Sequence, residues 1–155
     1  MYASLQNRTV IVTGGGRGFG RLMALALAEA GANVVITAAR AKEEVEETAR
    51  EANALGRGQV LGLVADVSRY EDCLRTVEET LALFGSLHGL VNNAARSPII
   101  GNPNYHTNRH KFWEESEDAF KLMVDTNFTG QFFMAKAAMP AMLAGGFGRI
   151  VNIST

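Results

Sequence analysis

The chain has 155 residues, with 15 Lys and Arg against 16 Asp and Glu, and its formal net charge is −1. This length fits one domain with a sizeable core, and the balanced charge gives no support for binding to nucleic acid or to an anionic membrane. Cys73 is the only cysteine, which excludes an intrachain disulfide and favours a reducing compartment. The N-terminus has no apolar signal-peptide core, and no apolar run is long enough to cross a bilayer. We therefore expect a cytoplasmic protein.

The first predicted strand and helix flank a glycine-rich turn. Residues 9–12 are apolar and β-branched, which predicts a buried strand, and the Ala/Leu-rich residues 22–30 predict a helix. Between them, residues 13–20 read TGGGRGFG. The glycines allow a tight turn and a close approach to a pyrophosphate, and the N–H groups of the new helix face its charge. This context predicts a dinucleotide site rather than a mobile loop; its residues here are Thr13, Gly14, Gly16, Arg17, Gly18, Phe19 and Gly20.

The remaining segments continue the alternation of strands and helices. Strands are predicted at 34–38, 60–65, 87–91 and 149–153, and helices at 42–55, from Ser68 as N-cap to Gly85, and at 116–143. Alternating strands and helices indicate an α/β fold with a parallel sheet covered on both faces. Together with the glycine turn, right-handed crossovers predict a doubly wound Rossmann sheet. No linker or repeat divides residues 1–155, so we expect a single NAD(P)-binding domain.

Arg40 occupies the place where an NAD-binding fold usually has an acidic residue. That acid follows the fingerprint by about 20 residues and binds the ribose 2′-hydroxyl, whereas this chain has Ala38-Ala39-Arg40. Arg40 and Arg17 can instead meet a 2′-phosphate. A hydrogen bond to a charged group is worth about 1.5–3 kcal/mol, or about 10- to 150-fold in affinity. The sequence therefore predicts NADP as the cofactor, with NAD as the second choice; the alternative for Arg40 is a solvated side chain.

Several motifs, in the same order, resemble those of the short-chain dehydrogenase/reductase family. Residues 13–20 match its TGxxxGxG pattern in full. Asp66 and Val67 resemble the segment after the third strand, where the family has an acid that contacts adenine. Residues 92–95 read NNAA and resemble its NNAG, with Ala95 in place of the glycine. The resemblance implies that Asp66, Val67, Asn93, Ala94 and Ala95 also bind the cofactor.

The same resemblance implies hydride transfer between nicotinamide and a small-molecule carbonyl or alcohol. Asn127 matches the helix asparagine that supports a proton relay through water in the family. When residues 148–151 are aligned, the catalytic serine of the family falls on Thr155, and Ser154 lies one position earlier. Either hydroxyl can polarise the substrate oxygen, and Thr155 is the aligned choice.

The YxxxK motif of the family, which supplies its proton donor, is missing from this sequence. None of Tyr2, Tyr70 and Tyr105 is followed by lysine four positions later, and Tyr105 with Arg109 precedes the serine position. We therefore predict a Rossmann fold truncated after the fifth strand, and we expect these 155 residues alone to be inactive. The alternative to an oxidoreductase is a catalytically inert dinucleotide-binding module.

Two further segments carry predictions about partners. The helix at 116–143 is apolar nearly all round, which favours a homo-oligomer contact over a thick single core. The loop from 96 to 113 holds Ile99, Ile100, Tyr105, His106, His110 and Trp113, and it either lines a substrate site or is an ordinary surface loop. His106 and His110 lack a further ligand, so no metal site is predicted. Cys73 has core spacing, which favours packing over a nucleophilic role.

Overall fold

A central parallel sheet organises the computed structural model, which describes residues 4–55, 57–97, 102, 104, 106–108 and 111–154. The sheet has five strands in the order β3-β2-β1-β4-β5. The strands are β1 (Thr9–Thr13), β2 (Asn33–Ala38), β3 (Val60–Val64), β4 (Gly89–Asn92) and β5 (Arg149–Asn152). All four strand pairs are parallel. The chain therefore winds outward from β1 to β3 and then returns to the other side of β1, which makes the switch point between β1 and β4.

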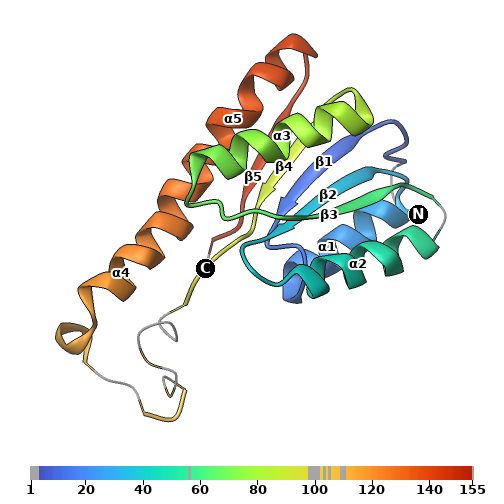
Figure 1. Cartoon of the computed structure of the whole chain (residues 1–155). Coiled ribbons are helices and arrows are strands. Elements are labelled where there is room, and N and C mark those ends of the chain that lie inside the picture. Colours follow the sequence, from blue (N-terminus) through green and yellow to red (C-terminus); the bar gives the residue numbers. More distant parts are fainter. Residues whose placement is uncertain are drawn as a thin grey trace.

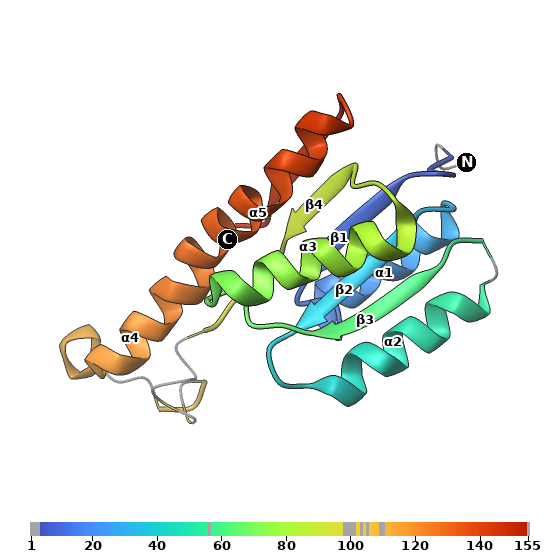
Figure 2. The same cartoon turned by 45° about the horizontal axis from the view of Figure 1, so that its top comes forward.

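Helices cover both faces of this sheet, as the predicted doubly wound fold requires (Figures 1 and 2). On one face, α1 (Gly18–Glu29) and α2 (Lys42–Ala54) pack through Ala24 and Val45 on Val12 and Ile36. On the other face, α3 (Tyr70–Phe84) and α5 (Gly130–Ala144) pack on the sheet, whereas α4 (Glu117–Val124) continues beyond it and joins α5 through η3 (Asp125–Thr129) (Figure 1). Strand residues therefore alternate between two apolar layers, and β1 is buried throughout. The α/β Rossmann prediction is confirmed.

Cys73 lies in the core between α3 and the sheet. Its side chain is 1% exposed, and its thiol donates a hydrogen bond to the carbonyl oxygen of Val67 at 3.4 Å. Burial and the neighbouring Asp72 raise the pKa of the Cys73 thiol to about 12. The thiolate that a nucleophile needs is thus suppressed, and the predicted packing role is confirmed.

Two local predictions are corrected by the structure. Ser68 does not cap α3, because the helix begins at Tyr70 with Arg69 in the capping position, and the Ser68 hydroxyl donates to Asp66 instead. The helix predicted at 116–143 is not regular, since a π-helical turn, η3, separates α4 from α5. Its start at Ser116 is confirmed, because the Ser116 hydroxyl accepts a hydrogen bond from the N–H of Ala119 at 3.3 Å.

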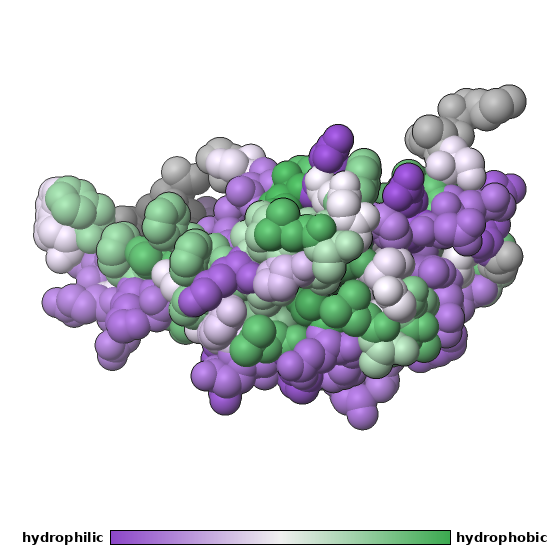
Figure 3. All heavy atoms as spheres, turned by 90° about the horizontal axis from the view of Figure 1, so that it is seen from above, coloured by the Kyte–Doolittle hydropathy of each residue, from purple (hydrophilic) through white to green (hydrophobic). Residues whose placement is uncertain are grey.

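Apolar side chains remain on the surface of several elements, and Figure 3 shows them gathered over the face that it presents. On α4, η3 and α5 the most exposed are Phe120, Phe128, Phe132 and Leu143, at 60%, 78%, 60% and 72%. Strand β5 forms one edge of the sheet, and its Val151 is 50% exposed. No helix of the described residues is both long and apolar enough to cross a bilayer.

Candidate functional site

The glycine turn between β1 and α1 is folded so tightly that a side chain at Gly14 or Gly20 would clash with neighbouring atoms. Gly14 and Gly18 have φ values of +66° and +54°, in the left-handed region that favours glycine. A Cβ on Gly20 would lie 2.0 Å from the carbonyl oxygen of Gly14. The N–H of Gly15 donates to the carbonyl oxygen of Thr37 at 2.9 Å, which ties the turn to the end of β2. The turn therefore packs closely against the start of α1 and is hydrogen-bonded to β2.

The N-terminus of α1 opens from this turn at the carboxyl ends of the strands. Arg17 stands at the capping position with an extended backbone, and no side chain of the described residues caps the helix. Its first N–H groups and its dipole therefore present partial positive charge. The side chains of Arg17 and Phe19 are largely exposed, and a Cβ on Gly18 would meet no atom within 4 Å. Such a terminus can accept a phosphate group.

Asn93 fastens the end of β4 to the glycine turn. Its side-chain Nδ2 donates to the carbonyl oxygens of Thr13 at 3.0 Å and Gly14 at 3.1 Å. The backbone N–H groups of Asn93 and Ala94 both donate to the Thr13 hydroxyl at 3.0 Å. Thr13, which is 1% exposed, and Asn93 thus hold the ends of β1 and β4 together at the switch point. Ala95 follows them and is exposed.

Asp66 lies after β3 in a small polar network. Its carboxylate accepts hydrogen bonds from the N–H of Ser68 at 3.0 Å and from its hydroxyl at 2.7 Å, and it pairs with Arg96 at 3.3 Å. Burial of Asp66 opposes ionisation, but the bonds from Ser68 and the charge of Arg96 outweigh it and lower the pKa of the carboxyl. Asp66 is therefore an ionised hydrogen-bond acceptor at neutral pH.

Val67, beside it, is a packing residue in the structure. It is 6% exposed, and a Cβ on Gly130 would lie 2.7 Å from one of its methyl groups. The side chain of Val67 thus lies against the first turn of α5, and only its backbone remains for a ligand contact.

Asn127 projects from η3 and holds the segment that follows β4. Its Oδ1 accepts a hydrogen bond from the N–H of Arg96 at 2.7 Å, and its Nδ2 donates to the carbonyl oxygen of Arg96 at 2.8 Å. Both polar groups of this side chain are therefore used. A π-turn shifts the helical register by one residue, and such turns often mark functional positions. The sequence pattern located Asn127 but did not reveal the π-turn or Arg96 as its partner.

The two arginines predicted to favour NADP follow neighbouring strands. Arg40 is exposed between β2 and α2, and Arg17 lies after β1. The Arg17 guanidinium is 3.9 Å from the Glu44 carboxylate, and both side chains are well exposed, so this ion pair restrains Arg17 little. The Thr48 hydroxyl donates to the carbonyl oxygen of Gly16 at 3.1 Å and joins α2 to the turn.

The predicted reactive end lies beside β4 at the end of β5. Ser154 is exposed, and Thr155 lies outside the described residues. An unpredicted amide pair joins the two strand ends, since Asn92 Nδ2 donates to Asn152 Oδ1 at 2.9 Å. Of the loop between 96 and 113, Ile99, Ile100, Tyr105 and His110 also lie outside the described residues. Trp113 is 66% exposed on the short helix η2 (Phe112–Glu114).

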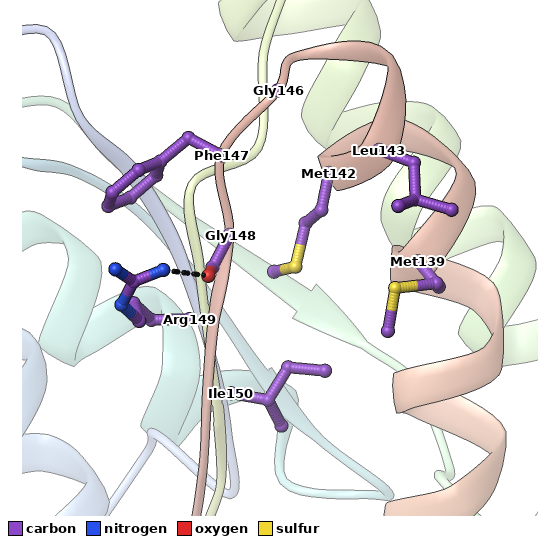
Figure 4. Close-up of a pocket in the computed structure, with 8 residues that line it drawn as sticks. All are labelled: Met139, Met142, Leu143, Gly146, Phe147, Gly148, Arg149 and Ile150. Atoms are coloured by element: carbon purple, nitrogen blue, oxygen red, sulfur yellow. Dashed lines mark hydrogen bonds between the residues drawn. The ribbon is translucent and has the colours of Figure 1, made fainter.

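A separate apolar pocket lies at the opposite end of β5 (Figure 4). It is formed where the end of α5 turns back into the strand, and its lining includes Met139, Met142, Leu143, Phe147 and Ile150. It lies at the amino end of β5, whereas ligands bind at the strand carboxyl ends in folds of this type. Among the described residues, no group of three His, Cys, Asp or Glu side chains is placed to hold a metal ion.

Comparisons with known proteins agree with this geometry. Residues 8–155 match the family model described as short chain dehydrogenase. The chain is 36% identical over 154 residues to 11-beta-hydroxysteroid dehydrogenase 1A of Arabidopsis thaliana, covering 98% of this chain and 40% of that protein. It thus spans less than half the length of that relative.

Two solved structures resemble the chain closely. One is a metagenomic short-chain oxidoreductase in complex with NADP, with a TM-score of 0.85, 28% identity, and coverage of 99% of this chain and 64% of that one. The other is NAD+-bound xylitol dehydrogenase, with a TM-score of 0.84, 27% identity, and coverage of 96% and 53%.

Proposed function

This chain belongs to the short chain dehydrogenase family, and on that premise we propose that it binds NADP and serves hydride transfer between nicotinamide and a small-molecule carbonyl or alcohol. The observation that carries the proposal is the uncapped N-terminus of α1, set in a glycine turn at the switch point of the sheet. Solved relatives bind NADP in one case and NAD+ in another, which supports a nicotinamide dinucleotide for this chain.

The residues present fit such a cofactor. The space beside Gly18 is open, which leaves room for a pyrophosphate against the backbone of the turn. We propose that Asp66 accepts a hydrogen bond from adenine, with Val67, Ala94 and Ala95 contributing backbone contacts. The cofactor, when bound, supplies the hydride donor or acceptor. The chain supplies its position.

Arg40 and Arg17 carry the proposed preference for NADP. Both follow adjacent strands, and Arg40 stands where an acid would otherwise meet the ribose 2′-hydroxyl. An exposed guanidinium is available to a 2′-phosphate and offers a bidentate contact.

At the reactive end, we propose that the hydroxyl of Thr155, or of Ser154, polarises the substrate oxygen. We propose that Asn127 supports a proton relay through water, and its side chain also holds the backbone of Arg96 after β4. The general acid of the family is not among these residues, because the sequence lacks the YxxxK motif.

A titration of the purified protein with NADPH and NADH, followed by cofactor fluorescence, tests the proposal. We expect NADPH to bind about 10- to 150-fold more tightly, the value of one charged hydrogen bond. Equal or reversed affinities would overturn the NADP preference, and no binding of either cofactor would overturn the function.

The second candidate is a dinucleotide-binding module without catalysis. It is favoured by the absence of the YxxxK motif from these 155 residues. Turnover of NADPH with a panel of ketones by the 155-residue chain would exclude it.

We further propose a cytoplasmic homo-oligomer that pairs through the helical region 116–143. The exposed Phe128 and Phe132 support this contact. Sedimentation of the protein before and after substitution of Phe128 by serine tests it, because loss of the apolar contact would shift the protein towards monomer.

A further inference from the structure

Arg96 connects two parts of the candidate site, the loop after β3 and the helical segment η3. Its Nη2 pairs with the Asp66 carboxylate at 3.3 Å, and its Nε donates to the Thr126 hydroxyl at 2.9 Å. Asp66 follows β3, whereas Thr126 lies in η3, between α4 and α5. One guanidinium therefore spans the loop after β3 and the helical segment that carries Asn127.

The environment of Arg96 restrains it strongly. Its side chain is only 15% exposed, that of Asp66 is 22% exposed, and Thr126 is buried at 5%. An ion pair removed from water to this degree is screened less than a surface pair. Arg96 also presents a fixed fork of donors, which two acceptors can fill at once.

The backbone of Arg96 is fixed as well. Asn127 binds both its N–H and its carbonyl oxygen, at 2.7 and 2.8 Å. Asn93 and Ala94, just before it, are anchored on Thr13. The Arg96 side chain is therefore held at both its root and its tip.

The remaining acceptor capacity of Asp66 shows what this arrangement achieves. Oδ1 accepts both hydrogen bonds from Ser68. Among the interactions of the described residues, Oδ2 accepts a single hydrogen bond, from Nη2 of Arg96. A carboxylate oxygen can accept two hydrogen bonds. Arg96 therefore fixes the direction of Oδ2 and leaves it able to accept one more donor.

We propose that Arg96 is a positioning residue: it orients the Asp66 carboxylate for the adenine end of the dinucleotide and ties that carboxylate to the helical segment bearing Asn127. This inference rests on the proposed function, because it assigns the adenine contact to Asp66. It adds that Asn127 influences adenine binding through the Arg96 backbone. The adenine end and the reactive end are thereby linked within the protein.

The test compares the dissociation constants of NADPH and of nicotinamide mononucleotide, which lacks adenine, for the 155-residue protein and its variants. We expect R96M to weaken NADPH binding about fivefold or more, since coupling within one hydrogen-bond network changes affinity by about 2- to 150-fold. The affinity for nicotinamide mononucleotide should change less than about twofold, because this ligand has no adenine to meet Asp66. The NADPH affinity of R96K should lie between those of the wild type and R96M, because a single ammonium group cannot contact Asp66 and Thr126 together.

Two comparisons separate positioning from a general structural role. In a D66N background, R96M should add almost nothing to the loss of NADPH affinity. R50M is the matched control, because Arg50 is also paired with a carboxylate, that of Glu47, but on the exposed surface of α2.

Unchanged NADPH affinity in R96M, equal losses for both ligands, or additive effects of D66N and R96M would each overturn the role of Arg96 while leaving cofactor binding intact. If the wild-type protein binds neither NADPH nor NADH, the proposed function fails, and the role of Arg96 fails with it.

Discussion

Replacing Gly20 by alanine tests whether the close approach in the glycine turn holds the site together. The added Cβ would lie 2.0 Å from the Gly14 carbonyl oxygen and 2.6 Å from Asn93 Nδ2. Both neighbours are fixed, the first by the backbone of the turn and the second by its two hydrogen bonds. The start of α1 must therefore move away, and the Asn93 contacts with Thr13 and Gly14 break.

The size of the effect follows from these contacts. Leaving a buried polar group unsatisfied costs about 1–3 kcal/mol, and two carbonyl oxygens and one amide are affected. Allowing for partial relaxation, we expect G20A to lower the free energy of unfolding by about 3–5 kcal/mol. For a domain of this size that corresponds to a fall in Tm of about 6–20 °C.

Gly18 provides the matched control within the same turn. Its φ of +54° is unfavourable for alanine, but an added Cβ meets no atom within 4 Å. G18A should therefore cost only the left-handed strain, about 1–2 kcal/mol, or about 2–8 °C in Tm.

Thermal unfolding followed by circular dichroism gives both Tm values, and a cofactor titration of the same samples measures the site. If G20A melts within about 2 °C of the wild type, or G18A is the more damaging variant, the proposed steric role of Gly20 is refuted.

Three further predictions concern charge and chemistry. R40A should weaken NADPH binding by about 10-fold or more and leave NADH binding nearly unchanged, because only NADPH carries the 2′-phosphate. Fluorescence titration measures both affinities, and equal losses for the two cofactors would contradict this role. Folding holds the pKa of the Asp66 carboxyl below 3.8, so the stabilisation from the ionised carboxylate is present above that pH and is lost as the pH falls through the folded-state pKa. In urea unfolding between about pH 5 and 2.5, the free energy of unfolding should therefore fall less in D66N than in the wild type. Cys73, with a pKa of about 12, should resist a thiol reagent at pH 8 until urea unfolds the chain, and rapid labelling of the folded protein would contradict its burial.

The sequence alone determined the order of strands and helices and the place of the glycine turn. These features depend on neighbours in the chain: apolar β-branched residues at 9–12 predict a strand, and glycines at 14–20 permit a turn that other residues resist. Their alternation predicts a parallel sheet with its switch point after β1. The family motifs then predicted that Asp66, Asn93 and Asn127 are site residues, and this stays a prediction.

Only the tertiary structure decided what those residues contact. Asn93 binds Thr13 across 80 positions of the chain, and Arg96 meets Asp66 across 30. Such pairings are set by how the strands and helices pack, and no local pattern encodes them. For the same reason Ser68, placed by its spacing as a helix cap, turns to Asp66 instead. Asn127 lies in the π-turn η3 and binds the backbone of Arg96, 31 positions away, so this contact also depends on the tertiary structure.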